Sequence, residues 1–277
     1  MIEHGERESL SYRASPYVRG VELLSAERTS RPWRFFCETY ALALSRDWAA
    51  SMQYRGRALD YGPGLVFCGL PGEVAATKRV IDAGGFDVLA IARETFEDHI
   101  AEHLSCRREL VWRGDLVSAS PNVSRALVRW NDTIAGSLSP LEIQSELVEL
   151  MAVIATELLE TSSEVARVGN VDARWLARVR ERLHDDEAWT DLATLADEAR
   201  LSRFQVLRAF KRHYGLSPHD YQVGVRVMKA RKLLRSSKLS AAEVALECGF
   251  ADQSHFIRCF KRIVGTTPRS YVRALGL

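Results

Sequence analysis

The chain has 277 residues, and its shares of 47% hydrophobic and 27% charged residues are typical of a folded protein of about two domains. No run approaches the roughly 18 consecutive apolar residues of a transmembrane helix, and the polar N-terminus lacks the hydrophobic stretch of a secretory signal, so we expect a cytoplasmic protein. The formal net charge of +2 hides an asymmetry, because residues 172–277 hold 20 Lys and Arg against 12 Asp and Glu, whereas residues 1–171 hold 18 against 24. A basic C-terminal half suggests a polyanion as its partner, although a basic surface can also be simply solvated.

The N-terminal part of the chain predicts β-strands separated by turns. Between about residues 18 and 91, apolar stretches rich in aromatic and β-branched residues alternate with Gly and Pro breakers, which indicates a small all-β barrel or sandwich. The predicted strands are residues 18–24, 35–44, 48–54, 64–69 and 86–91. An effector pocket in this domain could be lined by aromatic side chains, although aromatic residues on strands more often belong to the core: Trp33, Phe35, Tyr40, Trp48, Tyr54 and Phe67.

The periodicity becomes helical beyond about residue 96. Two helices are predicted, at about residues 123–135 and 139–160, and the second has Ser139 as its N-cap and Pro140 in its first turn. This second helix carries its apolar side chains on one stripe: Leu147, Leu150, Met151, Ile154 and Leu158. The stripe either packs against the β-domain of its own chain or forms a helix-to-helix dimer interface.

A linker is predicted at residues 161–171, where the periodicity is lost and small and polar residues collect. The change in charge falls at the same point. The sequence therefore predicts a domain over residues 1–160 and a second, entirely helical domain over residues 172–277.

One histidine motif and the set of cysteines could indicate a metal site, but the pattern of neither supports one. The segment His99-Ile-Ala-Glu102-His103 matches the H-x-x-E-H pattern of zinc peptidases, but so short a match is common by chance and no second motif accompanies it. The five cysteines include no Cys-x-x-Cys pair, which argues against a disulfide framework and a structural zinc site. We therefore expect reduced, mostly buried cysteines, and no metal, cofactor or catalytic residue.

The C-terminal domain contains an internal repeat with an offset of 50 residues. Residues 202–221 align without gaps on residues 252–271, and seven pairs of positions are identical: Arg208/Arg258, Phe210/Phe260, Lys211/Lys261, Arg212/Arg262, Gly215/Gly265, Pro218/Pro268 and Tyr221/Tyr271. So many matches predict two copies of one supersecondary unit. The aromatic pairs of the repeat are expected in the core.

Each copy has the pattern of a helix-turn-helix unit, at about residues 192–214 and 241–264. In the second copy Gly249 provides the turn between two helices and Asp252 caps the second of them. In the first copy Ser202 is the cap, and Arg200 occupies the turn, where a left-handed conformation costs a non-glycine residue roughly 1 kcal/mol.

A helix from Pro218 to about Ser236 joins the two copies. Its roughly 19 residues at about 1.5 Å each span about 28 Å. A rigid spacer of this order can place two recognition helices in successive major grooves, which lie about 34 Å apart on one face of DNA.

Residues 189–274 resemble the DNA-binding domain of the AraC/XylS transcription regulators. The resemblance rests on Ala245-Leu-Glu-Cys-Gly-Phe250, on Gln253-Ser-His-Phe256, and on Phe260-Lys-Arg262 with Gly265 and Thr267-Pro268. It implies seven helices with two helix-turn-helix units and a long linking helix. It also implies, more loosely, that the front domain is a cupin-like β-barrel with trailing helices that bind a small effector or a second subunit, so the whole chain is an α+β protein of two domains.

The resemblance and the chemistry of the side chains together suggest which residues touch DNA. Arg can pair with guanine, Gln with adenine, and apolar side chains can contact thymine methyl groups. The expected base contacts are Arg203, Phe204, Leu207, Arg208, Gln253, Ser254, His255, Ile257 and Arg258. The expected phosphate contacts are Ser202, Lys211, Arg212, Lys261 and Arg262.

The leading hypothesis is a homodimeric, sequence-specific transcription activator that binds promoter DNA, works with RNA polymerase and responds to a small-molecule effector in its N-terminal domain. The alternative is an effector-independent dimeric regulator whose N-terminal domain serves only for dimerisation. A third hypothesis, an enzyme with a DNA-binding tail, lacks any catalytic constellation in the sequence.

Overall fold

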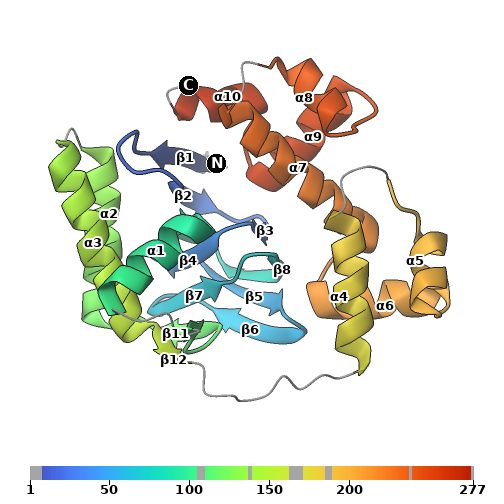
Figure 1. Ribbon diagram of the computed structural model, residues 1–277, viewed down its shortest axis with the longest axis horizontal. Helices are drawn as coiled ribbons and strands as arrows, with labels where there is room; N and C mark the ends of the chain where they lie inside the picture. The colour runs from blue at the N-terminus through green and yellow to red at the C-terminus, as the bar shows by residue number, and fades with distance from the viewer. Residues whose placement is uncertain are drawn as a thin grey trace, which may run out of the picture.

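The computed structural model describes residues 8–104, 110–136, 139–161, 171–184, 189–236 and 239–275. An N-terminal part of strands and three helices is followed by a C-terminal part in which the described residues form helices only (Figure 1). This is the predicted division into a mixed and an all-helical part. Most of the predicted linker, residues 162–170, lies outside the described residues.

The strands of the N-terminal part form two main antiparallel sheets. The first sheet has six strands in the order β1 (Ser9–Ala14), β2 (Val21–Thr29), β9 (Gly84–Ile91), β4 (Tyr40–Ser45), β7 (Leu65–Gly69) and β11 (Leu116–Ser118). The second has four, in the order β3 (Arg34–Cys37), β8 (Glu73–Asp82), β5 (Ala49–Tyr54) and β6 (Arg57–Tyr61), and a short pair joins β10 (Leu110–Trp112) to β12 (Leu159–Thr161). Among the described residues the sheets do not close into a barrel, so the sandwich is the better of the two predicted architectures.

An aromatic core fills the space between the two main sheets. Trp48, Tyr54 and Phe86 are fully buried, and Trp48 contacts Phe86 with ring centroids 5.0 Å apart. The core draws on both sheets, since Phe86 comes from β9 and Tyr54 from β5. Burial of large rings on both inner faces is what holds two sheets together in a fold of this kind.

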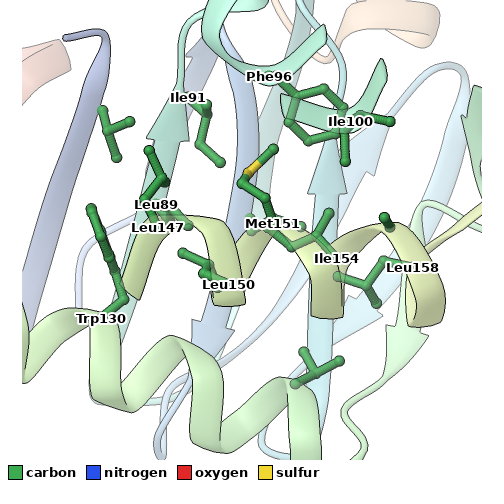
Figure 2. Packing of buried hydrophobic residues seen from close by; sticks show 14 of the residues in the cluster. Leu89, Ile91, Phe96, Ile100, Trp130, Leu147, Leu150, Met151, Ile154 and Leu158 are labelled. Atoms are coloured by element: carbon green, nitrogen blue, oxygen red, sulfur yellow. The ribbon is translucent and has the colours of Figure 1, made fainter. Parts of the chain in front are cut away.

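Three helices cover the outer face of the six-stranded sheet, namely α1 (Arg93–Leu104), α2 (Pro121–Ala135) and α3 (Pro140–Glu157). Figure 2 shows the predicted stripe of α3, Leu147 to Leu158, packed against Leu89 and Ile91 of the sheet, with Phe96 and Trp130 beside it. Because this stripe is buried within its own chain, it is not available for a dimer interface. The first of the two predicted alternatives is therefore correct.

Several strands of the N-terminal part were not predicted. The segment at residues 35–44 is two strands, because a turn at residues 38–39 sends β3 and β4 into different sheets. Strands β1, β6 and β8 also escaped prediction, since their residues are largely polar and their burial depends on distant partners.

The two helix-turn-helix units and the linking helix lie where the sequence predicts. The helices of the C-terminal part are α4 (Val171–His184), α5 (Leu192–Ala199), α6 (Arg203–Tyr214), α7 (Pro218–Ser236), α8 (Ala241–Glu247), α9 (Gln253–Val264) and α10 (Pro268–Ala274). Arg200 ends α5 in the left-handed conformation with φ 53°, and Gly249 provides the corresponding turn after α8 with φ 69°. The four repeat aromatics Phe210, Phe260, Tyr221 and Tyr271 are buried, as expected.

Candidate nucleic-acid interface

Helix α6 presents one buried and one exposed face. Val206, Phe210 and Tyr214 are buried against the rest of the C-terminal part. A capping box fixes the start of the helix, because Ser202 Oγ accepts from Gln205 N at 3.3 Å while Gln205 Oε1 accepts from Ser202 N at 2.9 Å. The side chains expected to contact bases are exposed at Arg203, Phe204 and Arg208, and partly buried at Leu207.

Phe204 is the most unusual of these side chains, because 67% of it is exposed. A large aromatic ring on a solvent-facing helix position gains nothing from hydrophobic burial. Its exposure beside Arg203 and Arg208 suits contact with a partner surface.

Helix α9 is built in the same way with a different cap. Asp252 Oδ1 accepts from His255 N at 2.7 Å, and this backbone hydrogen bond, together with the nearby Arg258 guanidinium, lowers the pKa of the Asp252 carboxyl. Phe256, Phe260 and Ile263 are among the buried residues of the helix. Gln253, Ser254 and Arg258 are exposed, and His255 and Ile257 are partly buried.

Of the residues expected to contact phosphates, Ser202 is the exposed N-cap of α6, and the other four lie about one turn beyond Arg208 and Arg258 on their helices. Lys211, Arg212, Lys261 and Arg262 are exposed. Arg262 also takes part in an ion pair within the chain, since its Nη1 lies 3.5 Å from Asp220 Oδ1 at the start of α7. Asp220 pairs in turn with Arg34 of β3 at 3.3 Å, so this carboxylate links both parts of the chain.

The N-terminal part docks on helices α7 and α10, which flank the second helix-turn-helix unit, through a buried carboxylate. Glu22 of β2 accepts from Arg231 Nη2 at 2.8 Å and from the Tyr271 hydroxyl at 3.3 Å, and it pairs with Arg235. The Tyr12 hydroxyl of β1 donates to the carbonyl oxygen of Val264. A carboxylate with this little exposure is retained because several donors compensate its lost hydration.

The first helix-turn-helix unit also contacts the N-terminal part. Gly56 N donates to His213 O at 2.9 Å, and Arg180 of α4 pairs with Glu73 of β8 at 3.1 Å. Burial raises the pKa of the Glu73 carboxyl, and the Arg180 guanidinium only partly opposes that shift. Both units are therefore held by the β-domain (Figure 1).

A cavity of about 240 Å³ lies where the sheets meet α7 and α9. Its apolar wall includes Phe35, Phe36 and Met228, and its charged side chains come from both parts of the chain: Glu22, Arg34, Glu38, Arg231, Lys232 and Arg235. The cavity joins the two parts, so a molecule bound there would contact both.

The predicted pocket residues divide between this cavity and the core. Trp33 and Phe35 line the cavity. Trp48, Tyr54 and Phe67 are instead buried between the sheets, and Tyr40 stacks on Phe96 with centroids 4.0 Å apart. Of the six aromatic side chains suggested for an effector pocket, Trp33 and Phe35 are therefore the two that line this cavity.

The sequence did not predict the C-terminal side of this cavity, since arginines on a linking helix carry no signal that they will face another domain.

Two further positions of the C-terminal part could not be predicted from the sequence. Val244 and Leu246 of α8 are both apolar, yet the Leu246 side chain is 76% exposed while Val244 is buried. Trp189 was not singled out either. Its position beside the turn of the second unit depends on the fold alone.

The histidine motif and the cysteines singled out in the sequence lie outside the helix-turn-helix interface or are buried. No group of three or more metal-ligating side chains occurs among the described residues. His99 contacts Thr95 O at 2.8 Å, and the side chains of Glu102 and His103 lie outside what is described. Cys37, Cys68, Cys248 and Cys259 are free and buried, and burial raises the pKa of the Cys37 thiol to about 12. Within the described parts, no helix is both long and apolar enough to span a bilayer.

Comparisons with known proteins agree with this arrangement. A family model described as a helix-turn-helix domain matches residues 195–274. The chain is 36% identical over 115 residues to the HTH-type transcriptional activator RhaS of Enterobacter sp. (strain 638), covering 40% of each chain. It is 31% identical over 161 residues to RhaS of Escherichia fergusonii, covering 57% of this chain and 55% of that one. The chain thus spans about half or less of the length of these relatives.

One solved structure resembles the chain over most of its length. It is the crystal structure of an apo form of a ToxT point variant from Vibrio cholerae, which matches with a TM-score of 0.53 and 13% identity over 93% of this chain and 98% of that chain. At this identity the likeness concerns the fold. It extends the agreement from the helix-turn-helix domain to the arrangement of both parts.

Proposed function

We propose that the chain is a member of the AraC/XylS family and a transcription regulator that binds promoter DNA in a sequence-specific manner, which its C-terminal helix-turn-helix domain and the similarity to RhaS support. The observation that carries the proposal is the pair of recognition helices whose first two turns expose side chains suited to base contact. Arg203, Phe204 and Arg208 lie on α6, and Gln253, Ser254 and Arg258 lie on α9. The relatives are named transcriptional activators, which supports activation here, and the proposal extends to RNA polymerase as a partner and to the cytoplasm as the location.

Two classes of contact are proposed within this interface. The base contacts are Arg203, Phe204, Leu207, Arg208, Gln253, Ser254, His255, Ile257 and Arg258. The phosphate contacts are Ser202, Lys211, Arg212, Lys261 and Arg262. Because Arg262 is paired with Asp220, DNA would have to compete with that carboxylate for its guanidinium.

The test compares Arg258→Ala with Lys261→Ala by fluorescence anisotropy, on a site selected from random DNA and on unrelated DNA. Arg258→Ala is expected to weaken binding to the selected site by about 1–3 kcal/mol and binding to unrelated DNA much less. Lys261→Ala is expected to weaken binding to both DNAs by a similar factor. It should also lower the slope of log affinity against log salt concentration by about one, which corresponds to one fewer released counterion. Equal losses on both DNAs from both variants would overturn the assignment.

The N-terminal part is proposed to be a cupin-like effector domain, with the effector in the cavity between the two parts. Support comes from the position of the cavity, since it is lined by α7 and α9 as well as by the sheets. A ligand that contacts both parts can change how the helix-turn-helix units are held.

This proposal is tested by thermal melting of the full chain across a metabolite library. A ligand at about 100 times its Kd stabilises the folded protein by about 2.7 kcal/mol. The matched variant is Ala90→Leu, which fills the cavity from β9. A compound that raises the melting temperature of the wild type should leave that of the variant unchanged. An equal rise in both proteins would place the binding site elsewhere. If no compound raised the melting temperature of the wild type, the effector-independent regulator would be favoured.

A homodimer is proposed as well, but through a different face of α3 from the buried stripe. Leu141 is 72% exposed and Val148 is 57% exposed, whereas Leu147 of the stripe is buried. Sedimentation of the Val148→Glu variant tests this face, and a dimer that persists unchanged would exclude it.

A further inference from the structure

Trp189 lies between the two helix-turn-helix units. It belongs to the first, because it precedes α5 directly and lines a cavity of about 300 Å³ together with Leu195 and Leu207 of that unit. Its indole Nε1 nevertheless donates to the carbonyl oxygen of Gly249 at 2.7 Å. Gly249 is the turn residue of the second unit, so this hydrogen bond links the units without passing through α7.

A second contact fixes the same turn from α7. Arg226, which is 5% exposed, donates from Nη1 to the carbonyl oxygen of Cys248 at 2.7 Å. Its guanidinium lies 4.4 Å from the centroid of the Trp189 ring, within the range of a cation–π interaction. The ring of His219, in the first turn of α7, stacks on Trp189 with centroids 5.6 Å apart.

The turn is shaped to accept these groups closely. Gly249 has a φ of 69°, which favours glycine, and a Cβ there would lie 2.2 Å from Arg226 Nη1. Two successive carbonyl groups, those of Cys248 and Gly249, therefore point at donors from outside the second unit. The turn that orients α9 is thus tied to the first unit and to the linking helix together.

We propose that Trp189, with Arg226, is a positioning residue that sets the separation between DNA half-sites that the protein accepts. This inference rests on the proposed function. One extra base pair between half-sites moves the second by about 3.4 Å and rotates it by about 34° around the DNA axis. If the connection between α6 and α9 is stiff, the protein binds the lengthened site weakly, because only one recognition helix fits its half-site. If the connection is loosened at the Gly249 turn, both helices can adjust and the affinity for the lengthened site falls less.

The experiment uses the full chain and DNA selected by the wild-type protein. Affinity is measured by fluorescence anisotropy for the selected site and for the same site lengthened by one base pair, in wild type, Trp189→Ala and Trp189→Phe. The ratio of the two affinities is expected to fall about fivefold in Trp189→Phe, which keeps a ring but not the donor, because this factor corresponds to the loss of one net hydrogen bond. Trp189→Ala also removes the ring that contacts Arg226 and His219, so its ratio should fall further.

The control is Tyr17→Ala, which removes another exposed aromatic ring, 48% exposed and located in the turn between β1 and β2. Its ratio should equal that of wild type. A Trp189→Phe protein that melts like wild type and keeps the wild-type ratio would overturn the role of the bridge. Failure of the wild type to select any two-part site would instead overturn the proposed function, and the two failures are therefore distinct.

Discussion

Glu22 offers the sharpest perturbation of the contact between the β-domain and helices α7 and α10 of the C-terminal part. Its side chain is 11% exposed and faces Arg231 and Arg235, whose side chains are 22% and 34% exposed. The Glu22→Gln substitution keeps the volume and removes the charge. The amide has only one oxygen that can accept hydrogen bonds, where the carboxylate had two. Its NH2 group must then face one of the donor groups of Arg231, Arg235 or Tyr271.

The magnitude follows from the degree of burial. Removing one partner of a fully buried pair costs about 3–5 kcal/mol, and the partial exposure of both arginines lowers our expectation to about 2–3 kcal/mol. Urea unfolding followed by circular dichroism should show this loss as a lower midpoint. The substitution should weaken the contact of β1 and β2 with α7 and α10 in particular. The hydrogen exchange of backbone amides in these elements should therefore increase before that of the rest of the chain.

The matched control is Glu27→Gln on the same strand. Glu27 pairs with Arg46, but its side chain is 51% exposed, so less than about 0.5 kcal/mol is expected from its loss. If Glu22→Gln destabilised the protein no more than Glu27→Gln, the buried carboxylate would not hold the two parts together and the reasoning would be wrong.

Two other predictions concern the remaining contacts between the parts. Burial, with the nearby arginine side chains, lowers the pKa of His213, so the unfolded chain takes up this proton at higher pH than the folded one, and stability falls as pH drops below about 6.5. Melting temperatures between pH 7.5 and 5.5 should therefore decline less in His213→Gln than in wild type; parallel curves for the two proteins would refute this. Gly224→Ala would place its Cβ 1.9 Å from the Phe36 ring, so we expect a loss of about 1–3 kcal/mol in urea unfolding despite the better helix former. The added Phe36→Leu change should restore most of it, whereas Gly62→Ala, whose nearest neighbour would be 3.4 Å away, should cost little; a neutral Gly224→Ala would show that the ring moves freely.

The helices of the two helix-turn-helix units and the linking helix could be predicted to within a residue because their signals are local. Ser202 and Asp252 cap the recognition helices, Gly215 and Gly265 end them in the left-handed conformation, and both copies repeat the same order of residues. The left-handed turn at Arg200 could be anticipated from its place between the two predicted helices of the first unit, where the second unit has Gly249.

The N-terminal part was less predictable because its contacts are distant in sequence. Strand β8 has a polar second half and becomes a strand only by pairing with β3 and β5. The cavity could be anticipated only on the side of Trp33 and Phe35, since Arg231 faces it through the docking of two domains. No periodicity or motif encodes that docking.

Footprinting with hydroxyl radicals tests the central claim most directly, with the full chain bound to a site that it has selected from random DNA. Two protected segments are expected on one face of the duplex, their centres about one helical turn apart. Arg208→Ala should weaken one segment and Arg258→Ala the other. A single protected segment, or protection that does not depend on sequence, would contradict a regulator that reads DNA with two helix-turn-helix units.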